Sequence, residues 1–232
     1  MMDIYIFESE LRAICQQTSK SKFFNMETGG DLYGTWTYEG NPIVFLAVGP
    51  GPMSLSHSTK FAQDNKYVEM CEKTLFYNFG LQYIGDWHSH HSLGLFEPSS
   101  GDRQRITNLL ASSRRNKMVE FIINHDVDDR KQRINSEIVN SFVYLQGTFN
   151  PYLANLHLLQ AKTSIVRKNL FETGCKSINL MEPSFPFKDI KTNQFKVQSD
   201  TRTNPSGGNY PDDFSCGKDH FSDIFGNKGG YK

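Results

Sequence analysis

The residue pattern with the clearest chemistry is a pair of histidines, His88 and His90, followed by a carboxylate, Asp102. The preceding segment, 81–87, is rich in aromatic and β-branched residues and predicts a strand. Side chains at positions i and i+2 of a strand point to the same face, so both imidazoles can converge on one ion. Two histidines and one aspartate leave the fourth position of a tetrahedral zinc ion open, as in catalytic zinc sites. We therefore predict one Zn²⁺ per chain, bound by these three residues.

Hydrolysis at such a site also needs a general base and a donor that faces the oxyanion. Glu27 is the candidate base, because it begins a glycine-rich segment whose small residues let a substrate backbone or the histidine segment approach closely. Ser99 is the candidate oxyanion donor, because it lies three residues before Asp102. Ser92 and Ser100 are alternative hydroxyls in the same region. We predict Glu27 and Ser99 to be the catalytic residues.

Two further polar residues flank the histidines. His91 points away from His90 if the strand persists, which places it on the substrate side or among the residues that support the ligands. Asp86, two residues before His88, is either an acceptor that orients an imidazole or a solvent-facing aspartate at the strand end. A basic cluster at 103–117 is interpreted as a solvated helix face, with docking of an acidic partner as the alternative.

The rest of the chain alternates helical and strand patterns, which predicts an α/β domain. Helices are expected in four segments, at 9–18, 64–79, 102–112 and 153–170, and the first three carry apolar residues at helical spacing. Strands are expected in five segments, at 29–36, 43–49, 81–87, 118–124 and 138–146. The histidines would then follow a buried strand at the mouth of an active site.

The composition changes near Gly174, beyond which Asn, Gly, Pro, Asp and Lys dominate. We therefore predict a core domain at 1–172 and a polar, irregular C-terminal extension at 173–232. The extension is either disordered or an arm that wraps the core or pairs with a partner. The second alternative rests on isolated aromatic anchors, which are Phe185, Phe187, Phe214, Phe221 and Phe225.

The bulk composition argues against several functional classes. Basic and acidic residues number 25 each, so the zero net charge gives no global signal for nucleic acid or an anionic membrane. The four cysteines have no metal-ribbon or disulfide-framework spacing. The N-terminus does not resemble a signal peptide, and no segment reads as a membrane span. We expect a cytoplasmic protein without nucleic-acid or membrane partners, whose oligomeric state the sequence does not determine.

Three motifs together resemble the JAB/MPN/JAMM metalloproteases over roughly residues 1–150. They are Glu-x-Gly-Gly-x-Leu-x-Gly, His-x-His and Pro-Ser-x-x-Asp. The resemblance implies a JAB/MPN metalloprotease domain at 1–172, a three-layer α/β fold in which helices flank a mixed β-sheet. It also implies that His88, His90 and Asp102 bind zinc, that Glu27 is the general acid/base, and that Ser99 stabilises the oxyanion.

One departure from the family pattern lies in the loop after the second histidine. Eight residues, 91–98, separate His90 from Ser99, where the family has seven. We place the extra residue within 92–97, where a glycine can absorb it.

The resemblance also implies a function. The zinc-dependent members cut isopeptide bonds after ubiquitin-like tails, and the doubled histidine is most similar to bacterial members, which often accompany ubiquitin-like conjugation systems. This predicts a ubiquitin-like protein substrate cleaved after Gly-Gly, with activating or conjugating enzymes of the same system as further partners. Two alternatives remain: a non-catalytic scaffold subunit of the same fold, or a zinc hydrolase of another amide substrate.

Overall fold

A computed structural model describes most of the chain, at residues 2–22, 24–58, 61–90, 95–128, 133–192 and 195–197. Four helices are described, α1 Glu8–Lys22, α2 Asn65–Phe79, α3 Ser100–Ser112 and α4 Ile165–Glu172, with a 3₁₀ turn at Phe187–Asp189. The long strands of the described ranges are β1 Met2–Ile6, β2 Gly29–Trp36, β3 Pro42–Ala47, β6 Gln82–Ser89, β7 Lys117–Asp128, β8 Arg133–Leu145 and β9 Tyr152–Leu158. The short strands are β4 Leu55–Ser56, β5 Phe61–Ala62, β10 Ile190–Thr192 and β11 Phe195–Val197.

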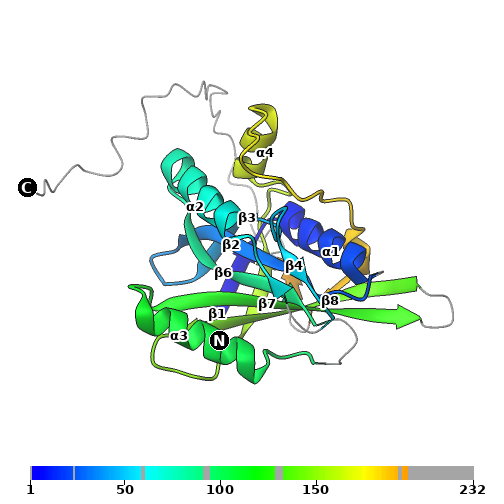
Figure 1. Ribbon diagram of the computed structural model, residues 1–232, viewed down its shortest axis with the longest axis horizontal. Helices are drawn as coiled ribbons and strands as arrows, with labels where there is room; N and C mark the ends of the chain where they lie inside the picture. The colour runs from blue at the N-terminus through cyan, green and yellow to red at the C-terminus, as the bar shows by residue number, and fades with distance from the viewer. Residues whose placement is uncertain are drawn as a thin grey trace, which may run out of the picture. The chain divides into compact units, whose positions relative to one another are not determined.

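The seven long strands form a closed mixed β-barrel (Figure 1). Their order is β8-β7-β6-β2-β3-β1-β9, and β9 pairs back with β8 through Phe142↔Leu153 and Val143↔Tyr152. Strand pairs β6–β7, β1–β3 and β1–β9 are parallel, and the other pairs around the ring are antiparallel. The predicted three-layer α/β domain with a helix-flanked sheet is therefore wrong, because the β8–β9 pairing closes the sheet on itself.

Two strands that the sequence analysis missed account for this error. Residues 153–170 were expected to form one helix, but they divide between strand β9 and helix α4. Burial in β9 alternates, with Ala154, Leu156 and Leu158 buried, which is the period of a strand with one face in a core. The N-terminal strand β1 lies between β3 and β9. Without these two strands, the remaining sheet has no means of closing.

The beginning of the C-terminal extension packs against the barrel. Strands β8 and β9 pair with each other over only two residue pairs. Farther along the same edges, β8 pairs with β10 and β9 pairs with β11. Strands β10 and β11 thus lie along the edges where the two barrel strands separate. Ile178, Met181 and Phe185 are buried in the apolar clusters of the barrel and its helices. The predicted division at 172 stays a prediction, since most of 173–232 lies outside the described residues.

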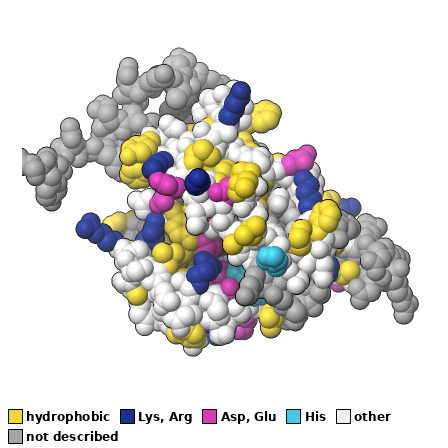
Figure 2. Space-filling model, viewed as in Figure 1, with side chains coloured by type: hydrophobic (Ala, Val, Ile, Leu, Met, Phe, Trp, Pro, Cys, Tyr) yellow, Lys and Arg dark blue, Asp and Glu magenta, His cyan; other side chains and the backbone are white. Residues whose placement is uncertain are grey.

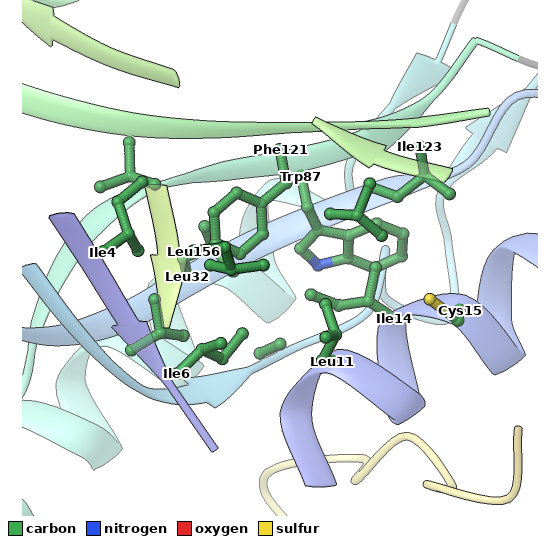
Figure 3. Packing of buried hydrophobic residues seen from close by; sticks show 14 of the residues in the cluster. Ile4, Ile6, Leu11, Ile14, Cys15, Leu32, Trp87, Phe121, Ile123 and Leu156 are labelled. Atoms are coloured by element: carbon green, nitrogen blue, oxygen red, sulfur yellow. The ribbon is translucent and has the colours of Figure 1, made fainter. Parts of the chain in front are cut away.

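The main core lies inside the barrel (Figure 3). Trp87 and Phe121 from neighbouring strands meet Leu11 and Ile14 of helix α1, and all four are fully buried. Helices α2 and α4 cover the outer face of β2 and β3, where Tyr33 and Leu46 join a second cluster. Helix α3 covers the outer face of β7 and β8 through a third cluster. The outer face of β6 between these helices is left to the polar residues described below.

A buried ion pair joins the first and last described helices. Arg167 donates from Nε and Nη2 to the two carboxylate oxygens of Glu10, at 2.7 Å each. Glu10 also accepts the amide of Ala47 at 3.0 Å, so α1, β3 and α4 are tied at one point.

No helix among the described residues is long and apolar enough to cross a membrane.

Candidate metal centre

Strand β6 and the residue that follows it bring the two predicted histidine ligands together. Asp86, His88 and His90 alternate along one face, as expected for a strand. The Nε2 atoms of His88 and His90 lie 3.0 Å apart. The backbone amide of His90 donates to the carbonyl of Ile123 at 2.9 Å, so strand β7 fixes the second histidine although β6 ends at Ser89.

Asp102 enters the site from the first turn of helix α3. Ser99 is the N-cap residue, and its hydroxyl accepts the backbone amide of Asp102 at 3.2 Å. In return, Asp102 Oδ2 accepts the backbone amide of Ser99 at 2.8 Å, which completes a capping box. The helix cap thereby fixes the carboxylate relative to the histidines.

The distances among the three donor atoms fit a tetrahedral metal site. Asp102 Oδ2 lies 3.6 Å from His88 Nε2 and 3.3 Å from His90 Nε2. Ligands placed 2.0–2.1 Å from zinc in tetrahedral geometry are about 3.3 Å from one another. The observed separations of 3.0, 3.3 and 3.6 Å bracket that value. Among the described residues, His88, His90 and Asp102 form a group of side chains that could hold a metal ion.

The second nitrogen of each imidazole faces an oxygen. His90 Nδ1 lies 3.0 Å from the carbonyl of Leu95, which also accepts the side-chain amide of Asn124 at 2.9 Å. His88 Nδ1 faces the carboxylate of Glu120, at 3.7 Å. Acceptors in these positions favour the tautomer that leaves Nε2 free for a metal. The donor set and its surroundings therefore fit an ion bound through Nε2 of both histidines.

A cleft of about 730 Å³ opens at this site. Figure 2 shows acidic, basic and histidine side chains gathered in a hollow on the face presented there. Strand β6 and helix α3 form the wall of the cleft that carries the candidate metal ligands. The β4–β5 hairpin contributes apolar side chains to a second wall. Residues that line the cleft include Glu27, Leu55, His57, Phe61, His88 and Ser99.

Glu27 lines the same cleft as the metal-site residues, just before strand β2. Its backbone amide donates to the carbonyl of His57 at 2.9 Å, which ties it to the β4–β5 hairpin. Burial raises the pKa of the Glu27 carboxyl above its usual value, although nearby His88 and His90 act in the opposite direction. A raised pKa suits a group that must accept and return a proton near neutral pH.

Asp102 and His88 shift each other's pKa because their side chains lie in contact. Burial alone would raise the pKa of Asp102, but hydrogen bonds from His88, His90 and Ser99 outweigh burial and hold it well below its usual range. Burial alone would lower the pKa of His88, yet the carboxylates of Asp102 and Glu120 raise it. The polypeptide thus favours an ionised carboxylate at this point of the cleft.

Ser99 lines the cleft, with its hydroxyl engaged by Asp102. The Oγ donates to Asp102 Oδ2 at 2.6 Å, in addition to accepting the Asp102 amide. This arrangement explains Ser99 as a helix cap, and its oxyanion role stays a prediction. Ser100 is exposed in the first turn of α3, whereas Ser92 lies outside the described residues.

Of the two flanking residues, Asp86 is described and His91 lies outside the described residues. Asp86 accepts hydrogen bonds from Tyr83 and Arg105 and lines the cleft. Its predicted support of the metal ligands stays a prediction. Arg105 was assigned to a solvated basic face, but it instead bridges Asp86 and the buried Glu120.

Glu120 is the residue at this site that the sequence analysis missed. It lies fully buried in the apolar run of strand β7, paired in register with Asp86 of β6. An ionisable side chain within a buried apolar strand is itself a signal, because its burial is costly unless it has partners. That signal, at Glu120 between Val119 and Phe121, was present in the sequence.

A second carboxylate faces Asp86 across the sheet. Asp31 on β2 pairs in register with Asp86 on β6, and its side chain accepts from Gln63 at 2.7 Å and from Tyr33 at 3.2 Å. Burial, together with the charge of Asp86, raises the pKa of Asp31 to about 7. Asp31 is therefore a buried carboxylate behind the cleft, next to Asp86, which lines it.

The glycines after Glu27 are required by the strands beside them. A Cβ on Gly30 would lie 2.0 Å from the carbonyl oxygen of Val48 and 2.8 Å from Trp87 Nε1. A Cβ on Gly29 would lie 2.7 Å from the carbonyl oxygen of Trp87 and 3.0 Å from His88 Cβ. The expected close approach thus involves the histidine strand itself.

Comparison with known proteins gives limited support. No protein-family model matches the sequence. The chain is 28% identical over 112 residues to the probable metalloprotease y4qB of Sinorhizobium fredii, across 47% of this chain and 66% of that relative. The solution structure of protein DSY2949 from Desulfitobacterium hafniense aligns with a TM-score of 0.46 and 15% identity, over 66% of this chain and 92% of that one. The first similarity hints at a metalloprotease, and the JAMM resemblance stays a prediction.

Proposed function

We propose that this chain is a zinc-dependent isopeptidase or peptidase that cleaves after the C-terminal Gly-Gly of a ubiquitin-like modifier. The observation that carries the proposal is the convergence of His88, His90 and Asp102 on one point of a cleft that Glu27 also lines. The similarity to a probable metalloprotease supports a metal-dependent hydrolase of peptide bonds. The modifier substrate rests on the motif resemblance alone.

The residues of the cleft divide the chemistry among them. When bound, Zn²⁺ supplies Lewis-acid chemistry, since it lowers the pKa of water at the site to about 7 and polarises a carbonyl. Glu27 takes the proton from the attacking water and returns it to the leaving amine, a role that its raised pKa favours. Ser99 turns its hydroxyl proton from Asp102 Oδ2, to which it donates at 2.6 Å, to the carbonyl oxygen as negative charge develops there.

The strand pair β4–β5 beside the cleft supports an extended substrate segment. The β4–β5 hairpin lies beside Glu27, and Leu55 and Phe61 add apolar surface near the metal ligands. An extended tail can lie along a strand edge and form main-chain hydrogen bonds, with small residues at the point of cleavage. Activating or conjugating enzymes of the same modifier system are the further partners that we propose.

The test is cleavage of a ubiquitin-like fusion whose Gly-Gly tail is joined to a reporter, with metal content measured on the same samples. Wild type, Glu27→Gln, His88→Ala and chelator-treated protein are compared. About one zinc per wild-type chain, with cleavage lost in the other three samples, supports the proposal. Zinc without cleavage overturns the modifier substrate and favours another amide. Absence of both zinc and cleavage overturns the enzyme and favours a scaffold subunit.

A further inference from the structure

Glu120 is a buried carboxylate with no role in the proposed reaction. Its side chain has no exposed surface, and it lies in strand β7 beneath helix α3. An ionised carboxylate in such surroundings is strongly destabilising unless charged or hydrogen-bonding groups surround it. Its partners therefore indicate what the residue does.

Three side chains face the Glu120 carboxylate. The Tyr144 hydroxyl donates to Oε2 at 2.6 Å, and Arg105 Nη2 donates to Oε1 at 3.5 Å. His88 Nδ1 lies 3.7 Å from the same Oε1. Tyr144 thus holds one oxygen, while the other is directed toward the metal ligand and its neighbouring arginine.

The two imidazoles of the metal site differ in what supports them. His90 Nδ1 lies 3.0 Å from the Leu95 carbonyl, within hydrogen-bonding distance. His88 Nε2 faces His90 and Asp102, so the opposite nitrogen, Nδ1, is left for Glu120. Metal-binding histidines commonly donate this second N–H to a carboxylate, which fixes the ring and the tautomer. At 3.7 Å, His88 Nδ1 and Glu120 Oε1 are farther apart than a hydrogen bond, so the inference requires the imidazole to move toward Glu120 when it binds metal.

We propose that Glu120 is the positioning residue for His88. Its carboxylate, held by Tyr144 and Arg105, accepts a hydrogen bond from the Nδ1–H of the imidazole and leaves Nε2 directed at the metal position. The inference deepens the proposed function and rests on His88 being a metal ligand. It also gives Arg105 a place in the site, since this residue links the Glu120 carboxylate to Asp86.

The first test measures metal affinity, by competition of Zn²⁺ and Co²⁺ against a chromophoric chelator. Glu120→Met keeps the length of the side chain and removes the acceptor, and we expect metal binding to weaken about 10- to 100-fold. Glu120→Gln keeps an acceptor oxygen without charge, so a smaller loss is expected. Glu137→Gln is the matched control, because Glu137 is also fully buried but pairs with His125 on the neighbouring strand.

The second test reads the tautomer of His88 in metal-free protein, from long-range proton–nitrogen correlations of nitrogen-15-labelled histidine. Wild type is expected to carry the Nδ1–H form, and Glu120→Met is expected to lose it. A folded Glu120→Met variant that keeps both the wild-type tautomer and, within twofold, the wild-type affinity overturns the inference. If that variant does not fold, Tyr144→Phe replaces it, with an expected affinity loss of about 2- to 10-fold from one missing hydrogen bond.

These results separate the inference from the proposed function. Wild-type protein that binds no metal, or binds it equally well after His88→Ala, overturns the metal site, while the tautomer measurement still tests Glu120. Metal binding that depends on His88 but not on Glu120 overturns only the positioning role.

Discussion

Ser99 and Asp102 cap helix α3 reciprocally, and the capping carboxylate is also a candidate metal ligand. Asp102 Oδ2 accepts from the Ser99 amide at 2.8 Å and from its hydroxyl at 2.6 Å. The same oxygen lies 3.3 Å from His90 Nε2. The stability of the helix and the position of the ligand therefore depend on one pair of residues.

Replacing the Ser99 hydroxyl tests this dependence. Ser99→Ala is expected to lower the free energy of unfolding by about 1 kcal/mol, because the Asp102 amide loses its acceptor. Metal affinity is expected to fall as well, whereas Ser99→Thr, which keeps a hydroxyl, retains most of both. Urea denaturation and chelator competition measure the two effects. Unchanged stability in Ser99→Ala would show that the cap contributes nothing.

Glu27 is predicted to act in proton transfer without binding the metal. Glu27→Gln is expected to reduce turnover about 10²- to 10⁴-fold, the usual contribution of general acid–base catalysis. Its zinc content is expected to match that of wild type, as measured by elemental analysis. Glu39→Gln is the matched control, since Glu39 is exposed in the turn between β2 and β3. Near-wild-type cleavage by Glu27→Gln would contradict the assignment.

Asp31 is expected to make stability depend on pH. Its pKa is about 7 in the folded protein, against 3.8 as the ordinary value, chiefly because of burial. Between these two pKa values the folded state binds more protons than the unfolded state. The contribution of Asp31 to the free energy of unfolding is therefore fully present below about pH 4 and is lost as the pH rises through 7. Three pKa units correspond to at most about 4 kcal/mol.

Asp31→Asn is expected to remove this pH dependence. The variant should be more stable than wild type above pH 7, because no buried charge forms beside Asp86. Urea unfolding at several pH values between 4 and 8 measures the difference. Parallel stability profiles for the two proteins would mean that Asp31 does not titrate in this range.

Arg167 and Glu10 form the buried ion pair between α4 and α1. Removing one partner leaves the other charge buried, so Arg167→Met is expected to cost about 3–5 kcal/mol of folding free energy. Adding Glu10→Gln to that variant removes the orphaned charge and should restore part of the loss. Urea denaturation of wild type, both single variants and the double variant gives the coupling energy. Additive effects would contradict the pairing.

Phe185 tests whether the start of the extension belongs to the barrel core. Its side chain is 7% exposed, so Phe185→Ala is expected to destabilise the protein by about 3–5 kcal/mol. Phe171→Ala is the control, because Phe171 on α4 is 79% exposed and should have little effect. Equal thermal and urea unfolding of the two variants would show that the extension adds no core.

The site could be predicted further than the fold. The alternation of His88 and His90 along a strand, followed by a carboxylate at a helix start, requires only local geometry, and the structure brings those residues together. Strand β2 was predicted with its observed bounds at 29–36, because a polar turn at 39–42 separates it from a second strand-like run. The catalytic and metal-binding roles themselves remain predictions.

The closed barrel could not be predicted from the local pattern of apolar residues, because one of its strands was interpreted as part of a helix. Residues 153–170 were taken as one helix, although burial at the start of this segment follows the strand period through Ala154, Leu156 and Leu158. The pairing of β9 with β1 joins residues as far apart in sequence as Met2 and Ala154, which no local window contains. The signal at Glu120 was local, a charged residue in an apolar run, but its partners Tyr144 and Arg105 come from other elements, so the sequence did not indicate its role.

The position of strand β1 has a consequence for the order of folding. During synthesis, β1 can meet β3 early, through Tyr5↔Ile43, but its other neighbour pairs through Met2↔Ala154. The edge of β9 that does not contact β8 stays unpaired until Phe195–Val197 has been synthesised. Pairings this distant in sequence raise the contact order, which places folding in the slow range of about milliseconds to seconds. The cleft, built on β6 and α3, therefore emerges from the ribosome before the barrel that supports it can close.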